Sequence, residues 1–220
     1  MPMSTAEVEG EKPNGPRSRK GVQTRARLVD AAKQIFEENG FLEARISDIA
    51  ERAGLSHGSF YHYFDSKEQV FREVAEEVLN RLASPMTDIV LVHGSSTPPA
   101  ERLRDAIHRH LEMYQEDARI MAVIEQVSRY DDYVRDVIEK QNREGRELMA
   151  DSIKQLQKRG MADRALEPQI ASAALGSMTS RFAELWLAQE LVDFDLDAAS
   201  ETVTRLFVNA LGLDERARRP

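Results

Sequence analysis

The chain has 220 residues, of which 41% are hydrophobic and 31% charged, so it can bury a sizeable core and is too apolar to be disordered throughout. It contains no cysteine, which excludes a disulfide framework and a thiolate metal site and suits a reducing compartment. No stretch has the apolar length of a signal peptide or a membrane span. We therefore expect a cytoplasmic protein that does not bind membranes.

The net charge of -8 argues against a polyanionic partner for the chain as a whole. The charge is unevenly spread, however. Residues 17–27 hold no acid and carry several cations: Arg17, Arg19, Lys20, Arg25 and Arg27. Such a run suits an arm that binds a phosphate backbone, although a solvated charge run at a frayed terminus has the same composition.

Residues 1–22 are polar and lack hydrophobic periodicity, which predicts a disordered tail. A first helix is expected from Gln23, with an apolar stripe at spacings of three and four and a stop at Gly40. The stripe consists of Leu28, Ala31, Ala32, Ile35 and Phe36.

A second, two-turn helix is expected to begin near Ile46 and to end at Gly54. Ser56 is a suitable N-cap for a third helix that runs to about Phe64. Two short helices joined by three residues form a helix-turn-helix. A capping signal, Asp65 with Glu68 or Ser66 with Gln69, then opens a long helix through about residue 83.

Pro85 and residues 94–99 break the pattern, and further helices are expected at about 100–117, 118–128, 131–159, 168–190 and 197–212. No alternating strand pattern is present. The sequence thus predicts an all-α fold with three parts: a disordered tail at 1–22, a three-helix domain with the helix-turn-helix at 23–70, and a larger helical domain at 71–220.

The third helix has the two faces that a recognition helix needs, apolar inside and small and polar outside. Phe60 and Phe64 share the inner side. On the outer side, Gly58 allows the backbone to approach DNA, while Ser59 offers a hydroxyl to bases or phosphates.

The N-terminal motifs, taken together, resemble those of the tetracycline-repressor (TetR) family of transcription regulators. The resemblance covers about residues 23–71 and rests on Thr24-Arg25, Leu28, Ala31-Ala32, Phe36, Gly40-Phe41, Ile49-Ala50, Ala53-Gly54-Leu55-Ser56, Gly58-Ser59-Phe60-Tyr61, Tyr63-Phe64 and Lys67-Glu68.

By this resemblance, one set of positions meets DNA: His57, Gly58, Ser59, Tyr61, His62, Tyr63 and Lys67. The chain departs from the family where a Thr or Ser normally precedes the second helix, because Ala44 and Arg45 stand there. That helix is therefore expected to lack its usual cap, with Arg45 and Ser47 taking over the phosphate contact.

The resemblance also implies that the last two long helices pair across a twofold axis, as two palindromic half-sites require. The expected homodimer interface consists of Ala171, Leu175, Leu185, Trp186, Val203, Leu206, Phe207 and Ala210. Adaptable thioether, aromatic and aliphatic side chains suggest a pocket for a hydrophobic small-molecule effector. The candidate lining is Met113, Tyr114, Met121, Ile124, Val127, Tyr133, Met149, Met178 and Phe182.

We therefore expect a ligand-responsive regulator, in its simplest form a repressor that binds a palindromic double-stranded operator as a dimer and is released by the effector. It is expected to be no enzyme and to need no cofactor. Two alternatives stay open. One is a constitutive architectural DNA binder without an effector, and the other is a metal-binding helical protein that uses His108, His110 and Glu112.

Overall fold

The structure, a computed structural model, describes residues 19–90 and 97–213, and for 84–90 the backbone alone. The described residues form helices and their connections without any strand, which confirms the all-α fold. The elements are α1 (Arg19–Glu43), α2 (Ile46–Arg52), α3 (His57–Phe60), α4 (Lys67–Val90), α5 (Pro99–Glu116), α6 (Ala118–Ser128), α7 (Asp132–Lys158), α8 (Pro168–Ala183), the π-helix η1 (Glu184–Ala188) and α9 (Leu196–Leu211).

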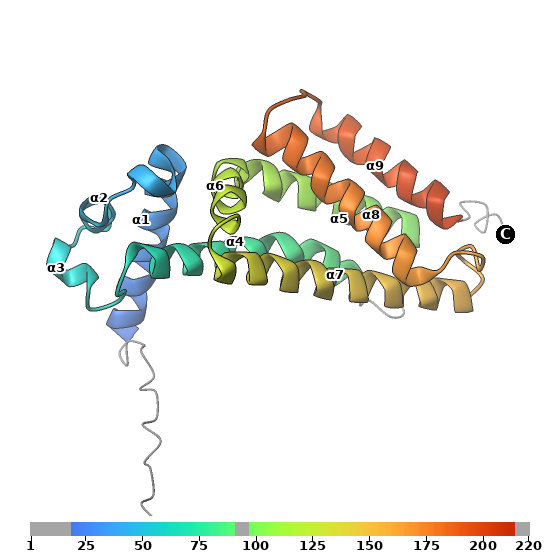
Figure 1. The fold of residues 1–220 in the computed structure, drawn as a ribbon. Helices are drawn as coiled ribbons and strands as arrows, with labels where there is room; N and C mark the ends of the chain where they lie inside the picture. The colour runs from blue at the N-terminus through green and yellow to red at the C-terminus, as the bar shows by residue number, and fades with distance from the viewer. Residues whose placement is uncertain (1–18, 91–96, 214–220) are drawn as a thin grey trace, which may run out of the picture.

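Helices α1–α3 form a small bundle at one end of the molecule, and α4 leads from it into the larger helical body (Figure 1). Within the body, α4 packs against α5 and α7, α7 against α8, and α5 against α9. Helix α6 stands beside α1, where the bundle meets the body (Figure 1). None of the helices in the described ranges combines the length and apolarity needed to cross a membrane.

The expected helix-turn-helix is present, and local interactions explain where its helices begin and end. Gly54 ends α2 with a φ of 67°, a left-handed conformation that favours glycine. The Ser56 hydroxyl accepts a hydrogen bond from the Ser59 amide at 3.2 Å and so caps α3. Arg45 precedes α2 without a side-chain cap, as the sequence predicted.

Several helix ends differ from the predictions, and α1 continues past the predicted stop to Glu43 although Gly40 itself is non-helical with a φ of 69°. Helix α1 begins at Arg19 rather than Gln23. The prediction missed its first turn because that turn is solvated and shows no apolar periodicity. The α-helical part of α3 ends at Phe60 rather than Phe64, and turns follow it. Helix α4 continues through Pro85 to Val90, which shows that a proline need not end a helix. The predicted tail up to residue 18 and the predicted break at 94–96 lie outside the described residues.

The body helices lie close to their predicted ranges, and acidic N-caps open three of them. Asp131 accepts from the Val134 amide at 3.1 Å, Glu167 from the Ile170 amide at 2.8 Å, and Asp195 from the Ala198 amide at 3.0 Å. The main departure is in the predicted helix 168–190. Its last turn is the π-helix η1, in which the Gln189 amide reaches the Glu184 carbonyl at 2.8 Å. Single π-helical turns are rare and are frequent at functional sites.

An aromatic cluster joins α1 to α4. The Phe71 ring lies edge-on to Phe36 and Phe41, with centroids 4.9 Å apart in each case. All three side chains are buried. Such edge-to-face contacts stabilise a core beyond the area they bury, so this cluster fixes the position of α1 on the first turns of α4.

Lys67, at the start of α4, stabilises the connection between α1 and α2. Its ammonium group donates to the carbonyls of Phe41, Leu42 and Ala44 at 2.7, 3.1 and 3.0 Å, and lies 4.7 Å from the centroid of the Phe41 ring. These carbonyls end α1 and lead into α2. A single cation therefore satisfies backbone acceptors that the helices leave open.

We predict that Lys67→Met lowers the free energy of unfolding by about 2 kcal/mol, because carbonyls that now accept from a charged group lose their partner. Denaturant unfolding followed by circular dichroism measures the change. Lys140→Met is the matched control, since its ammonium is exposed and lies 4.0 Å from Glu144. Equal stability of both variants would contradict the structural role given to Lys67.

Candidate nucleic-acid interface and effector-binding body

The predicted recognition residues gather on the outer side of α3 and the turn after it. His57, Gly58, Tyr61 and His62 are exposed, and Tyr61 retains 48% of its accessible surface. Phe60, by contrast, is fully buried in the core. The tight turn after α3 thus keeps the apolar and polar side chains on the opposite sides that a recognition element needs.

Contacts among these residues order the exposed face. The His57 and Tyr61 rings meet edge to face with centroids 5.3 Å apart, and the Ser56 and Ser59 hydroxyls are 2.8 Å apart. A Cβ added to Gly58 would meet nothing within 4 Å. Packing within the chain therefore gives no reason for a glycine at this position, whereas close approach of a partner does.

Other predicted contact residues are placed less uniformly. Arg45 and Ser47 are exposed at the start of α2, and the Ser47 hydroxyl donates to Asp48 at 2.9 Å. Tyr63 is half-buried and packs against the core. Lys67 uses its ammonium on backbone carbonyls, which leaves it poorly suited to a phosphate contact.

From Arg19 onward the basic run is helical, and two of its cations have partners within the chain. Arg25 pairs with Glu73 and lies 4.4 Å from the centroid of the Phe64 ring, and Arg27 donates to the Ala53 carbonyl. Burial lowers the pKa of Arg25 from its ordinary value. Arg19 and Lys20 are exposed, and Arg17 lies outside the described residues.

The proposed effector residues divide into two groups. Those at the centre of the body are buried or half-buried: Met113, Tyr114, Met121, Ile124, Val127, Met149, Met178 and Phe182. Tyr133 lies apart from them near the start of α7. It is 44% exposed, its hydroxyl donates to Glu76, and its ring centroid is 5.2 Å from the Arg72 guanidinium.

Two carboxylates that the sequence did not indicate, Glu125 and Glu184, lie near Tyr114 of the buried group. Burial and the carboxylates of Glu125 and Glu184 raise the pKa of Tyr114 above its ordinary value. Burial and Glu184 likewise raise the pKa of Glu125. Glu184, in η1, accepts from Arg181 and Gln189, each at 2.6 Å. The phenol and the two carboxylates thus interact at the junction of α5, α6 and η1, and their separation in the chain hides this from the sequence.

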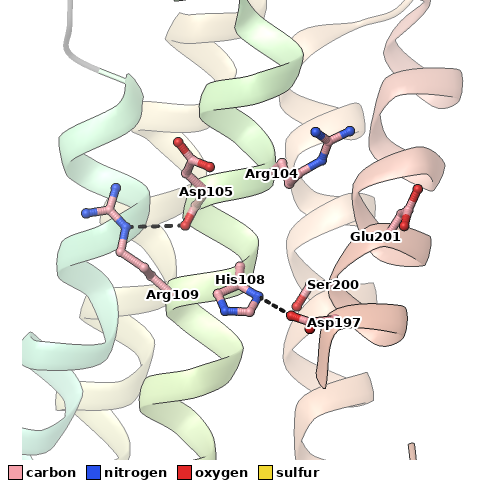
Figure 2. A pocket seen from close by; sticks show the side chains of 7 residues that line it. All are labelled: Arg104, Asp105, His108, Arg109, Asp197, Ser200 and Glu201. Atoms are coloured by element: carbon pink, nitrogen blue, oxygen red, sulfur yellow. Dashed lines mark hydrogen bonds and ion pairs between the residues drawn. The ribbon is translucent and has the colours of Figure 1, made fainter. Parts of the chain in front are cut away.

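A separate groove of about 720 Å³ runs between α5 and α9. Figure 2 shows Arg104 and His108 on α5 facing Glu201 and Asp197 on α9. The His108 ring nitrogen is 3.6 Å from the Asp197 carboxylate. None of the proposed effector residues lines this groove. The i, i+4 spacing of the two basic residues on α5 and of the two acidic residues on α9 is the sequence signal that could have indicated it.

The histidines considered as metal ligands have other neighbours. His108 faces Asp197, and the His110 ring nitrogen is 3.1 Å from the Leu82 carbonyl, where burial lowers its pKa. Across residues 19–90 and 97–213, no group of three or more candidate ligands comes together.

The proposed dimer residues differ in how far they are exposed. Leu175, Trp186, Val203 and Phe207 are buried within the chain's own core, and Ala171 and Leu185 are half-buried. Leu206 and Ala210 are exposed on α9, one turn apart, with Leu206 48% exposed. On α8, Ile170 and Ala174 form a similar exposed pair.

The family model for bacterial regulatory proteins of the tetR family matches residues 28–74, and the model for the tetracyclin repressor-like C-terminal domain matches residues 96–189. The HTH-type transcriptional repressor KstR2 of Mycolicibacterium smegmatis is 30% identical over 168 residues, which cover 72% of each chain. The uncharacterised HTH-type regulator YdgC of Bacillus subtilis is 34% identical over 99 residues, 44% of this chain and about half (51%) of that protein.

Among solved structures, the transcriptional regulator FadR from Bacillus subtilis, in complex with stearoyl-CoA, superposes with a TM-score of 0.68 at 21% identity. The match covers 84% of this chain and 98% of FadR. The two family models together span more than half of the chain, and the likeness to KstR2 extends over both of its parts. The chain belongs to the TetR family of bacterial transcriptional regulators.

Proposed function

We propose that this regulator is a repressor that binds a palindromic operator as a homodimer and is released by a hydrophobic small-molecule effector. The single observation that carries the DNA contact is the exposed face of α3, where Gly58 has no packing role within the chain. The proposed contact residues are Arg45, Ser47, His57, Gly58, Ser59, Tyr61, His62 and Tyr63. The relative KstR2 is named as a repressor, which supports repression.

A dimer would bring two such faces to one side of the DNA, about 34 Å apart, so that both enter successive major grooves. The exposed apolar pairs on α8 and α9 support a twofold interface there. The proposed surface consists of Ile170, Ala174, Leu206 and Ala210. The predicted dimer residues that are buried in the chain's own core, such as Val203 and Phe207, would hold α8 and α9 in place beneath this surface.

The proposed effector pocket lies between α5, α6 and α8. Apolar side chains such as Met121 and Ile124 surround one end of it, and Tyr114 with Glu125 forms a polar end. This lining suits an amphipathic molecule with an acyl, steroid-like or aromatic part and one hydrogen-bonding group. The neighbour FadR was solved with stearoyl-CoA, which supports a lipid-like effector. By linkage, the effector would release DNA only as far as it prefers the other state.

Selection of random duplex DNA on the purified protein tests the proposal directly. A recovered palindrome supports a dimeric regulator, and its release by pooled lipophilic metabolites or by stearoyl-CoA identifies the effector class. Failure to enrich any sequence at moderate salt would contradict the proposed operator binding.

Gly58→Leu should abolish close approach to the groove and lower operator affinity at least about tenfold, without loss of thermal stability. Tyr61→Ala should cost about 1–3 kcal/mol of operator binding, with the dimer intact. Gly145→Leu is the control, since Gly145 is exposed on α7 and an added Cβ there also meets nothing within 4 Å. Fluorescence anisotropy with labelled operator measures both effects. Full affinity in Gly58→Leu would show that another face binds DNA.

Leu206→Arg should convert the proposed dimer into monomers, because it places a charge on the twofold surface. Sedimentation velocity measures the mass. Leu191→Arg changes an equally apolar residue that is 67% exposed but lies beyond η1, and it should leave the mass unchanged. Dimers in both variants would place the interface elsewhere.

Glu125→Gln should raise the melting temperature at about pH 8, and the gain should shrink as the pH falls toward about 4.5. The folded chain raises the pKa of Glu125 above its ordinary 4.5, so the native state holds the proton more tightly than the unfolded state. Native stability from this group is therefore lost as the pH rises through the raised pKa. Calorimetry at several pH values tests this, with the exposed Glu139→Gln as control. A gain that does not vary with pH would argue against a buried, protonatable Glu125.

A further inference from the structure

Asp117 stands at the junction of α5 and α6 and is the only charged residue that the structure buries completely within the described ranges. Its backbone continues the helical pattern, because its amide donates to the Met113 carbonyl at 3.2 Å and its carbonyl accepts from Met121 at 2.9 Å. Its side chain caps no helix. Desolvation of a buried carboxylate costs free energy. No capping hydrogen bond offsets that cost at Asp117, so another interaction must account for an acid at this junction.

The carboxylate instead lies between cations from two other helices. The Lys33 ammonium, on α1, is 3.2 Å from Asp117 Oδ1, and the Arg81 guanidinium, on α4, pairs with Oδ2. The side chain of Asp117 is 1% exposed, against 28% for Lys33 and 44% for Arg81. We call these three residues the interdomain ion cluster, because Lys33 belongs to the DNA-binding bundle and Asp117 to the body.

Further charges hold the cations in place. Lys33 also lies 2.7 Å from the Glu37 carboxylate on its own helix, and Arg81 lies 3.9 Å from Glu116. The two cations thus contact three carboxylates, and Asp117 is the one that both cations share. Lys33 reaches Asp117 from the middle of α1, where α6 packs beside it (Figure 1).

We propose that Asp117 is a positioning residue that sets the orientation of the DNA-binding bundle relative to the body through Lys33 and Arg81. The hydrophobic effect is non-directional, so burial of apolar area between α1 and α6 does not by itself select one arrangement. A buried carboxylate is costly to separate from its cations, so the cluster favours the arrangement that keeps Lys33 and Arg81 beside Asp117. A displacement of the first turn of α6 would have to carry α1 with it or break the cluster.

The orientation can be measured directly, because the chain has no cysteine to interfere with labelling. Spin labels on Glu51→Cys in α2 and Glu139→Cys in α7, both exposed positions, report the distance between bundle and body. Labelled chains diluted with an excess of unlabelled chains restrict the signal to one chain. Pulsed electron–electron double resonance then gives the distribution of distances between the two labels.

Lys33→Met removes the α1 partner and leaves Arg81 beside the carboxylate. We expect a shifted and broadened distance distribution, and restoration of the parental one in Lys33→Arg, which keeps the charge. Arg52→Met is the matched control, because it removes a cation paired at 2.8 Å with Glu38 inside the DNA-binding bundle. Its distribution should equal that of the parent.

Asp117→Asn is a second variant, which keeps the shape of the side chain and removes its charge, and it should broaden the distribution as well. Parental distributions in both Lys33→Met and Asp117→Asn would overturn the proposal. Equal broadening in Arg52→Met would overturn it too, since loss of any cation would then have the same effect.

The consequence for operator binding rests on the proposed function. Poor orientation penalises simultaneous binding of two half-sites, so Lys33→Met should lower affinity for the full palindrome about tenfold or more. Affinity for a duplex with a single half-site should stay that of the parent, because the recognition face is unchanged. Equal losses on both duplexes would mean that the variant damages the bundle itself and would overturn the positioning role. If no operator exists, the proposed function fails, while the distance measurement still decides the role of Asp117.

Discussion

Helix α4 runs from the DNA-binding bundle into the body within one hydrophobic core, and α1, α5 and α7 pack on it. In its first turns Val70 and Phe71 are buried, and the Phe71 ring packs against the aromatic side chains of α1. Its middle carries Val78 and Leu82, which are buried where the body helices pack on it. A single continuous helix therefore links the DNA-binding bundle to the body.

Charged contacts add direction to this framework. They concentrate where segments distant in sequence meet: Arg25 with Glu73 between α1 and α4, Arg72 with Asp131 between α4 and α7, and Asp117 with its two cations. Burial acts to raise the pKa of Asp131, but the Arg72 contact at 2.9 Å and hydrogen bonds from the Val134 and Tyr133 amides together lower it below its ordinary value. Exposed pairs contribute little to stability, but partly buried ones restrict geometry. The fold thus combines apolar attraction with a few charge pairs that choose among similar packings.

Local sequence patterns identified most helix ends because the chemistry of an end is local. Ser56 accepts from an amide three residues on, and Gly54 adopts a left-handed turn, whatever the rest of the chain does. The same reasoning failed at Pro85, where α4 continues to Val90, and at the first turn of α1, which has no buried face to reveal it. Lys67 shows a further limit, since a lysine in a family motif can serve backbone carbonyls as readily as phosphates.

The sequence by itself determined the all-α class, the helix-turn-helix, the exposed character of His57, Tyr61 and His62, and the family, because periodicity, caps and motif spacing are properties of neighbouring residues. It could not decide which side of α9 faces the chain's own core, and Phe207 turned inward while Leu206 stayed outside. Nor could it bring Lys33 and Arg81 to Asp117, or Glu184 near Tyr114. Only the tertiary structure decided these pairings, because they depend on how distant helices pack and not on any local pattern.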